Sequence, residues 1–347
     1  MEQVVVSDFG AFLGKHSERL VIRRKDKEDE EHALMNLDGI IVASPGVSIS
    51  SDLISECTDR GIEINFLTFS GRPFAKVVSP SLTATVVTRR EQLSAMGDVR
   101  GLKIALRFAG GKIRNQINLI KYFSKHRKTA DVEAYARLME KVNDMEAIEG
   151  ELCEIKGENV DGARGSIMNL EGRAAALYWD SVKLIISDKG EFTKRKHRYA
   201  DDAINAALNY GYGILYSQVW SALVLAGLEP FAGFLHVDRP GKPSLVLDFI
   251  EEFRQPVVDR VVLASITKGF KIEREKNVVE NGGSGGIYRL SEKTRKSLAD
   301  KVLGRLESEE RFERKNRKIR NIIQLQANHL AMYFRGEREY KPFVASW

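Results

Sequence analysis

The sequence LHVDRPGKPSLVLDFIEEF, at residues 235–253, contains the features on which the interpretation of this chain depends. His236 precedes a loop broken by proline and glycine, and the loop leads into a short predicted helix. At helical spacing Asp248, Glu251 and Glu252 fall together on one face, at i, i+3 and i+4. The opposite face is apolar and consists of Val246, Phe249, Ile250 and Phe253.

This arrangement has two interpretations. Three carboxylates on one helical stripe repel one another unless a cation or a partner neutralises them. With the nitrogen of His236 brought beside them by the preceding turn, the oxygens form a mixed donor set that suits manganese, magnesium or zinc. The alternative is an acidic stripe exposed to solvent and a histidine that is hydrogen-bonded elsewhere. Charge on one helix face is common, so spacing alone leaves both interpretations open.

Composition indicates ordinary globular material. The chain has 347 residues, of which 43% are hydrophobic and 29% charged, and this length is sufficient for two domains. Its two cysteines, Cys57 and Cys153, lie far apart and no CxxC motif is present, which excludes a disulfide framework and a cysteine zinc site. No signal peptide and no membrane-spanning apolar run is recognisable. We therefore expect a soluble protein of the reducing cytoplasm.

Charge is unevenly distributed along the chain. Residues 1–85 contain nine Lys and Arg against thirteen Asp and Glu, a balance of −4, although the whole chain carries +6. The remaining residues therefore carry a balance of +10. A basic larger part joined to an acidic smaller part favours a polyanionic partner for the larger part.

The first part of the chain predicts a small, mainly-β domain. Residues 1–80 contain short runs rich in β-branched and aromatic residues, separated by turn signals, and one helix near residues 52–60. A docking or dimerisation role is the simplest use for such a domain. The predicted strands lie in the ranges 4–9, 19–24, 32–37, 39–44 and 62–69.

The rest of the chain predicts a larger, all-α domain, so the fold class is α+β. Residues 81–90 are expected to be a linker, and residues 91–347 a helical catalytic domain. A helix break is expected at Gly110-Gly111, and the tail from about 291 to 335 is expected to be helical. The glycine run at 281–286 predicts a turn, because no Gly-Lys-Ser/Thr follows it.

Glu171 lies in an unusual position for a carboxylate. In the predicted helix over residues 166–180 its neighbours one turn away on either side are apolar, and no cation lies within reach on its own helix. A buried carboxylate needs a partner from elsewhere or must stay protonated. That partner is either a distant arginine or a metal ion shared with His236 and the acidic residues of 248–252.

Basic segments point towards a nucleic acid. The runs at 194–198 and 311–320, together with Lys103, Arg107, Lys112 and Arg114, are suited to contact a phosphate backbone. No G-x-S-x-G, no cysteine with a plausible base and no GxGxxG after a strand is present. Basic segments combined with a carboxylate–histidine site favour a metal-dependent enzyme that acts on phosphodiesters.

An ordered series of short motifs runs through nearly the whole chain and resembles a known family. The chain is similar to the CRISPR-associated endonuclease and integrase of spacer acquisition, CRISPR-associated protein one. The motifs are Lys112 with Asn115-Gln116, Glu171-Gly172 followed by A-A-x-L-Y, RYADDAINAALNYGYG from 198, GFLH at 233–236, SLVLDFIEEFR at 244–254 and Y-x-P-F at 340–343. Two mild departures, Ala203 where proline is common and Ile250 where methionine is frequent, do not affect the proposed ligands.

The resemblance implies specific roles for the site residues. It implies one divalent metal ion, Mn²⁺ or Mg²⁺, held by Glu171, His236 and Glu251. Asp248 matches a further acidic position near the metal, with a catalytic or supporting role. Glu252 matches a variable position and is expected at the surface. The residues expected to contact DNA are Lys194, Arg195 and Arg198 of the basic run, and Tyr210, which matches a family tyrosine.

The resemblance also implies an activity and partners. The family forms a homodimer that joins the small CRISPR-associated protein two, captures short DNA duplexes and inserts them into the repeat array. In that reaction a DNA 3′-hydroxyl attacks a phosphodiester, and the same site cleaves branched DNA. Two alternatives remain from the residues alone: a non-catalytic DNA-binding scaffold with a structural acidic cluster, and a metal-dependent hydrolase of small phosphorylated molecules.

Overall fold

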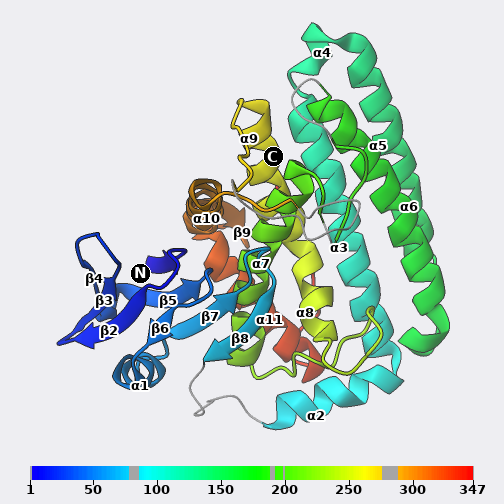
Figure 1. Cartoon of the computed structure of the whole chain (residues 1–347). Helices are drawn as coiled ribbons and strands as arrows, with labels where there is room; N and C mark the ends of the chain where they lie inside the picture. Colours follow the sequence, from blue (N-terminus) through cyan, green and yellow to red (C-terminus); the bar gives the residue numbers. More distant parts are fainter. Residues whose placement is uncertain (1, 78–85, 188–191, 198–199, 276–287, 347) are drawn as a thin grey trace. The chain divides into compact units, whose positions relative to one another are not determined.

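The computed structural model describes residues 2–77, 86–187, 192–197, 200–275 and 288–346. The chain forms two compact units, each assembled from separate segments (Figure 1). Unit 1 consists of Met1–Leu82, Lys196–Ser217 and Lys271–Gly304, and unit 2 of Thr83–Arg195, Gln218–Phe270 and Arg305–Trp347. The first change of unit falls inside the predicted linker at 81–90, but two later segments group with the N-terminal one. The predicted division into two sequential domains stays a prediction.

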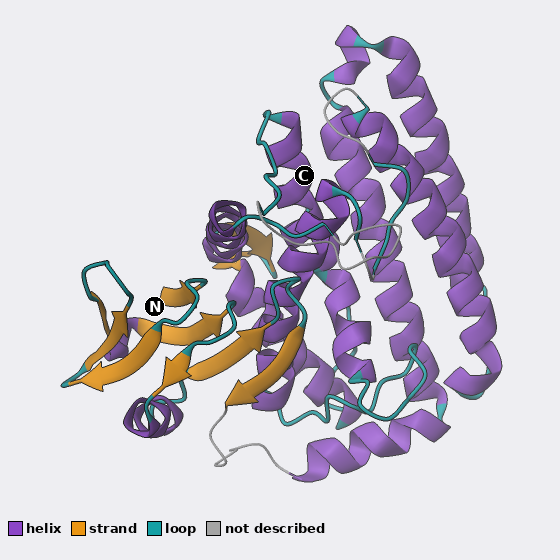
Figure 2. Cartoon of the chain, viewed as in Figure 1, coloured by secondary structure: helices purple, strands orange, loops and turns teal. Residues whose placement is uncertain are grey.

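Unit 1 is built on two four-stranded sheets, shown in orange in Figure 2. In the first, β1 (Glu2–Val6), β5 (Leu37–Val42) and β7 (Glu63–Leu67) are parallel, and β8 (Pro73–Val77) pairs antiparallel to β7. The second has the order β4-β3-β2-β6, from strands Glu30–Ala33, Arg19–Arg23, Phe12–His16 and Ser48–Ile49. The strand expected at 32–37 is instead the end of β4 and the turn η1 (Leu34–Asn36).

The core of unit 1 is apolar, and one helix covers it. Val6, Leu13, Ile22 and Ile40 are buried together with Leu53 of helix α1 (Ser51–Asp59). Ser50 caps the start of α1 by accepting a hydrogen bond from the amide of Leu53. The strand-rich N-terminal region predicted from β-branched runs is therefore confirmed, and so is the α+β fold class.

Helix α7 (Ala203–Leu225) begins in unit 1, where its backbone touches the turn between β7 and β8. A Cβ on Gly213 would lie 1.5 Å from the carbonyl oxygen of Gly71, so only glycine fits there. Gly71 itself has φ of +82°, in the region that favours glycine. This close approach buries the face of α7 that carries Tyr210.

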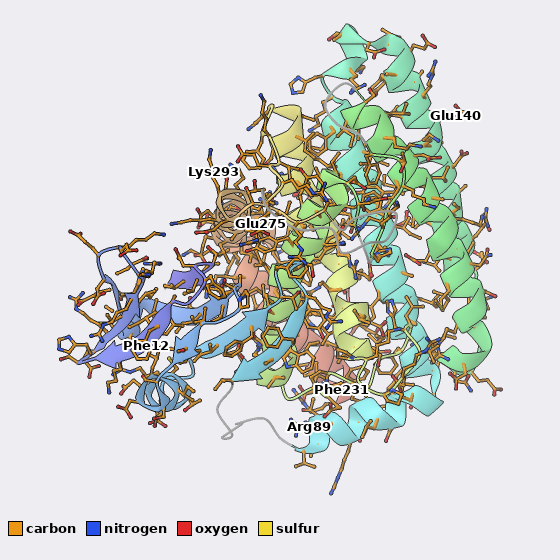
Figure 3. The ribbon with its side chains drawn as sticks, viewed as in Figure 1. Phe12, Arg89, Glu140, Phe231, Glu275 and Lys293 are labelled. Atoms are coloured by element: carbon orange, nitrogen blue, oxygen red, sulfur yellow. The ribbon has the colours of Figure 1, made fainter. Side chains whose placement is uncertain are left out.

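Unit 2 is predominantly helical, and its longest helices pack against one another. These are α3 (Val99–Ser124), α5 (Val132–Cys153) and α6 (Val160–Ile186), capped at their starts by Asp98, Asp131 and Asn159. Their side chains fill the space between the ribbons (Figure 3). The remaining helices with bounds in this unit are α2 (Val86–Ser94), α4 (Arg127–Ala130), α8 (Ser244–Phe249), α9 (Arg260–Thr267) and α11 (Ile319–Phe334).

Two expectations for the helical region are wrong. Helix α3 continues through Gly110-Gly111, because these glycines serve packing rather than a break. A Cβ on Gly111 would lie 2.7 Å from the side chain of Pro342, so glycine lets the C-terminal segment approach the helix. The tail expected to be helical is divided by an antiparallel hairpin, β9 (Glu309–Phe312) and β10 (Lys315–Lys318), between α10 (Glu292–Glu307) and α11.

The turn expected at 281–286 lies outside the described residues. Within them, no helix combines the length and the apolarity that crossing a membrane requires.

Candidate active site

The segment after residue 243 does not form the regular helix that its spacing predicts. Helix α8 (Ser244–Phe249) tightens into the 3-10 turn η3 (Ile250–Glu252) and then widens into a π-helical stretch, η4 (Arg254–Asp259), before α9 begins. Changes of helical pitch of this kind are frequent at functional sites, because they redirect side chains. Here they separate the three predicted carboxylates.

All three carboxylates are buried, so the interpretation as an exposed acidic stripe is wrong. Asp248 and Glu252 are 0% exposed and Glu251 is 4% exposed. Burial of three carboxylates in a run of five residues is tolerated only if each one has its own partner. The altered pitch gives each a different set of partners.

Asp248 holds His236 and the loop in front of it. Its Oδ2 accepts hydrogen bonds from the amides of Phe234 at 2.6 Å and Leu235 at 2.9 Å. Its Oδ1 accepts one from the amide of His236 at 2.9 Å and lies 2.6 Å from Nδ1 of the same residue. A carboxylate at Nδ1 makes that nitrogen the donor and leaves Nε2 as the acceptor. Asp248 is therefore a positioning residue for His236.

Glu171 and Glu251 face one ammonium group. Lys112, from α3, forms an ion pair with Glu171 of α6 and another, at 2.7 Å, with Oε2 of Glu251. Arg254 lies on the other side of Glu251, with 3.3 Å between its Nε and Oε1. The side chains of Lys112 and Glu251 are only 15% and 5% exposed. Glu171 thus has the partner from another helix that its apolar surroundings require, and this partner is a lysine.

The charges of this cluster stabilise its ionised forms. Burial raises the pKa of Glu251. The charges of Arg254, Lys112 and His236 together outweigh burial, so the pKa is lowered to about 2. Burial lowers the pKa of Lys112, but Glu251 and Glu171 outweigh it, so the pKa is raised above its ordinary value. His236 is therefore near enough to Glu251 to act on its charge.

Glu252 points away from this cluster, and the expectation of a surface position is wrong. Its carboxyl group lies 2.6 Å from the hydroxyl of Tyr340, 2.8 Å from the amide of Phe343 and 3.2 Å from Nε2 of Gln326. Burial raises the pKa of Glu252, and although these hydrogen bonds lower it, the pKa is about 8. Glu252 therefore fixes the C-terminal segment to the interior of unit 2.

The donor set fits a divalent cation, although the side chains are not closed around one. In the described part of the chain no three His, Cys, Asp or Glu side chains are gathered closely enough to ligate a metal ion. Oε2 of Glu251 is buried, and its partner among the described residues is the ammonium of Lys112, with which it forms an ion pair. Nε2 of His236 has no partner among the described residues, and the side chain is 26% exposed. A cation that replaced the Lys112 ammonium would meet the two carboxylates of Glu171 and Glu251.

The residues expected to contact DNA are placed unequally. Lys194 is exposed, and Arg195 lies over the ring of Trp179, 5.8 Å from its centroid. Arg198 lies outside the described residues. Tyr210 is fully buried within unit 1, and burial raises its pKa to about 12. Tyr210 therefore offers no surface to DNA, and the β7–β8 turn packs against its backbone.

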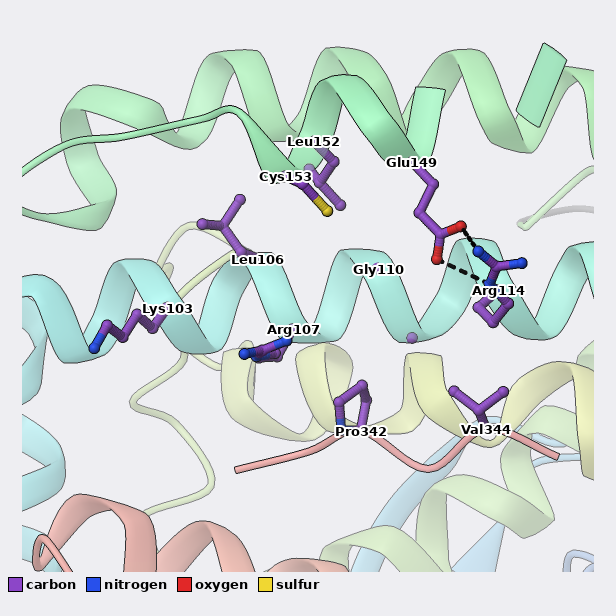
Figure 4. Close-up of a pocket in the computed structure, with 11 residues that line it drawn as sticks. Lys103, Leu106, Arg107, Gly110, Arg114, Glu149, Leu152, Cys153, Pro342 and Val344 are labelled. Atoms are coloured by element: carbon purple, nitrogen blue, oxygen red, sulfur yellow. Dashed lines mark hydrogen bonds and ion pairs between the residues drawn. The ribbon is translucent and has the colours of Figure 1, made fainter. Parts of the chain in front are cut away.

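The basic side chains of α3 do not form one surface. Lys103, Arg107 and Arg114 line a pocket of about 560 Å³ between α3, α5 and the C-terminal segment (Figure 4). In this pocket Arg114 forms an ion pair with Glu149. Helical spacing puts Lys112 on the opposite side of α3, where it faces Glu171. The pocket is therefore separate from the carboxylate–histidine cluster.

Two members of the cluster had no role in the sequence-based prediction of the site. The sequence shows Lys112 only as part of a motif and as one of several basic residues. Its pairing with Glu171 and Glu251 could not be predicted, because they lie 59 and 139 positions away. Arg254 had a usable signal, because it lies at i+3 from Glu251.

Replacing Asp248 by asparagine tests its positioning role. The two carboxylate oxygens of Asp248 share the hydrogen bonds from the loop amides and from His236, whereas an asparagine has only one acceptor oxygen. Its NH₂ group would face backbone N–H groups, which are donors themselves. We expect the free energy of unfolding, measured with urea, to fall by about 2 kcal/mol. Asp161→Asn, which removes an exposed pair with Arg164, is the control and should change it by less than about 0.5 kcal/mol. Equal effects of the two changes would contradict the role of Asp248.

The helical unit thus contains a buried ion-pair cluster, in which Glu171 and Glu251 share the ammonium of Lys112, and a histidine oriented by Asp248. Comparison with known proteins identifies the family. The chain matches the family described as CRISPR associated protein Cas1 over residues 4–303, and it belongs to this family. It is 35% identical over 354 residues to CRISPR-associated endonuclease Cas1 1 of Archaeoglobus fulgidus, covering 99% of this chain and all of that protein.

Solved structures share the fold. A casposase bound to integration product has a TM-score of 0.83 and 22% identity, covering 99% of this chain and 93% of the casposase chain. A chain of a Cas6-RT-Cas1–Cas2 complex has a TM-score of 0.77 and 20% identity, covering 99% of this chain and 36% of the other. The resemblance to CRISPR-associated protein one seen in the sequence motifs is therefore confirmed.

Proposed function

We propose that this chain is a metal-dependent DNA endonuclease and integrase of CRISPR adaptation. The observation that carries the proposal is the pairing of Glu171 and Glu251 at the ammonium of Lys112, together with the Asp248-bound His236, in a chain of the Cas1 family. The relative from Archaeoglobus fulgidus is named an endonuclease, which supports the same class of reaction.

The chain's own residues supply the binding and orientation for the reaction. Glu171, Glu251 and Nε2 of His236 would hold Mn²⁺ or Mg²⁺, and this ion supplies positive charge that stabilises the phosphate as it reacts. Asp248 fixes the tautomer and direction of His236. Lys112 and Arg254 keep Glu251 ionised. The low exposure of Glu251 keeps bulk water from weakening these interactions.

The proposed reaction is a transesterification. A 3′-oxygen of the incoming DNA forms a new bond to phosphorus, and the bond from phosphorus to the 3′-oxygen of the target strand breaks. The attacking hydroxyl loses its proton and the departing oxygen gains one, so the number of phosphodiesters is conserved. With water as the attacking group the same site hydrolyses the phosphodiester, as in cleavage of branched DNA.

The proposed partners follow from the family. They are double-stranded and branched DNA, a second copy of this chain, and the small CRISPR-associated protein two. The titles of the structural neighbours, one bound to an integration product and one a Cas1–Cas2 complex, support these partners. Phe9, Met35 and Phe74 of unit 1 are 80%, 76% and 62% exposed, which supports a docking role for that unit.

Isosteric replacement of the proposed ligands tests the activity. With Mn²⁺ present, we expect Glu171→Gln, His236→Asn and Glu251→Gln each to lower the rate of branched-DNA cleavage more than about 100-fold. Circular dichroism should confirm that the variants are folded. Glu149→Gln, on the opposite side of α3, is the matched control and should retain the wild-type rate. Wild-type rates in all three ligand variants would refute the assignment.

One observation favours a second function, a non-catalytic DNA-binding scaffold. Lys112 already pairs with both carboxylates, and with Arg254 it balances their charge, as in a purely structural cluster. Such a scaffold would bind DNA in a salt-dependent way. It would neither cut DNA nor bind Mn²⁺, so calorimetric titration with Mn²⁺ separates the two functions.

A further inference from the structure

The hairpin β9–β10 ends in a strained turn. Glu313 and Arg314 form its two-residue loop, and both have positive φ, +47° and +67°. Positive φ at both loop positions defines a type I′ turn, for which Asn-Gly is the preferred sequence. Residues with a bulky side chain are costly in this conformation and persist only where surrounding structure enforces it. The choice of arginine over glycine at the tip therefore needs a reason other than folding.

The hairpin is firmly attached to the rest of unit 2. Phe312 stacks on His329 of α11, with the ring centroids 6.1 Å apart, and meets Phe343 edge-on at 6.0 Å. On the same face of the ribbon Glu310 accepts hydrogen bonds from Arg305 at 2.6 Å and Arg260 at 3.2 Å. One face of the ribbon is thus fixed inward, and the other is left to solvent.

The turn itself is held by an ion pair. Arg338 donates a hydrogen bond to the carboxylate of Glu313 at 3.0 Å, and Nε2 of His329 lies 4.0 Å from the same carboxylate. These contacts bind the first residue of the turn. The second residue, Arg314, is left exposed at the tip.

Three cations near the tip of the hairpin lack a counter-charge: Arg311 on the outward face, Arg314 in the turn, and Lys315, which lies opposite Phe312 at the end of the ribbon. Arg311, Arg314 and Lys315 are exposed, and none of them forms an ion pair with any residue in the described ranges. Nearby cations are neutralised, because Lys318 and Arg320 pair with Glu307, and Arg338 pairs with Glu313. A cluster of unpaired positive charge on a rigid ribbon attracts a polyanion.

We propose that the β9–β10 tip binds the phosphate backbone of duplex DNA through Arg311, Arg314 and Lys315. The proposal rests on the proposed function, which supplies DNA as the polyanion, and it adds a site outside the carboxylate–histidine cluster. The outward face of the ribbon has only polar side chains, those of Glu309, Arg311, Asn316 and Lys318, with Asn316 beside Arg311. An acidic protein partner would need an apolar anchor there, whereas phosphate contacts need only arginine, lysine and asparagine.

The salt dependence of DNA binding tests the tip directly. Binding of a short fluorescent duplex is measured by anisotropy in EDTA, over a series of salt concentrations, for the wild-type chain and for Arg311→Gln/Arg314→Gly/Lys315→Gln. Each phosphate contact contributes about 0.9 to the slope of log K against log salt. We therefore expect the triple variant to lose about 2.7 from the magnitude of the slope and at least about tenfold in affinity at 0.1 M salt.

A charge-matched control separates local contact from general electrostatics. Lys128, Lys156 and Lys268 are also exposed, and replacing all three by glutamine removes the same net charge from scattered positions. We expect the slope of this control to differ from that of the wild type by no more than about 0.9, the contribution of one phosphate contact. An equal loss of slope in both triple variants, or no loss in the hairpin variant, would overturn the proposal. Lost binding of poly-glutamate with unchanged DNA binding would also overturn it and assign the tip to an acidic protein.

The single change Arg314→Gly distinguishes binding from a structural role. Glycine adopts a φ of +67° without strain, so the thermal midpoint of unfolding should rise, while the salt slope should fall by about one contact. A lower midpoint would mean that Arg314 serves the fold. DNA binding by the hairpin is measured without metal, so it is independent of the cleavage assay. A chain that fails to cleave branched DNA would refute the proposed function, but the measured contribution of the hairpin to DNA binding would still hold.

Discussion

Replacing Lys112 by methionine is expected to lower the free energy of unfolding of the metal-free protein by about 3–5 kcal/mol. Methionine keeps much of the length and volume of the side chain but removes its charge. Glu171 and Glu251 would then face each other without the ammonium that now lies between them, 2.7 Å from Oε2 of Glu251. The loss is large because one buried carboxylate is left uncompensated, and Arg254 remains beside only one of the two.

The same variant tests metal binding without any activity measurement. If Mn²⁺ takes the place of the ammonium, it should restore a substantial part of the lost stability of Lys112→Met, because a ligand that binds only the folded state stabilises it. Urea unfolding is therefore compared in EDTA and in excess Mn²⁺. Lys141→Met, which removes a pair 3.8 Å from the exposed Asp180, is the control and should cost less than about 1 kcal/mol. Identical curves with and without Mn²⁺ would contradict the proposed metal site.

Replacing Glu252 by glutamine is expected to abolish a large part of the pH dependence of stability. The pKa of Glu252 is raised from 4.5 to about 8, so between these values the folded protein binds a proton that the unfolded chain has released. Stability therefore decreases as pH rises, by up to about 1.4 kcal/mol for each pH unit between roughly 4.5 and 8. Below pH 4.5 this contribution is fully present, and above pH 8 it is lost.

Glutamine is a sharp replacement at this position because it fits the hydrogen bonds of the protonated acid. Its oxygen can accept from Phe343 and Gln326, and its NH₂ group can donate to the hydroxyl of Tyr340. We expect the variant to be close to wild type at pH 5 and more stable than wild type at pH 8.5, by urea unfolding. Glu149→Gln should leave the wild-type slope unchanged. Parallel pH profiles of wild type and Glu252→Gln would show that Glu252 is ionised in the folded state.

The sequence was a good guide to features that depend on local pattern. β-Branched runs predicted the strand-rich N-terminal region, and the helix expected near residues 52–60 is α1. The apolar neighbours of Glu171 indicated that a partner must come from elsewhere, and the structure supplies Lys112. His236 and Asp248, twelve positions apart, are brought together by the loop between them, as was expected from the sequence for His236 and the acidic residues.

Features that depend on tertiary contact were predicted poorly. A regular helix from 244 would put three carboxylates on one face, but tertiary packing imposes the 3-10 and π turns that separate them. Gly110-Gly111 resembles a helix break until Pro342, more than 230 positions later, is packed against it. Tyr210 is polar at one end and could lie at a surface, yet the contact between Gly213 and Gly71 buries it.

The most direct test of the central claim is strand transfer of a short duplex into a plasmid that carries a CRISPR repeat, measured with Mn²⁺ for the wild-type chain together with the small CRISPR-associated protein two. We predict joined product from a duplex with 3′-hydroxyl ends, none from 3′-dideoxy ends, and none from the Glu251→Gln variant. Equal product from wild type and Glu251→Gln would contradict the assignment of the carboxylate–histidine cluster as the active site.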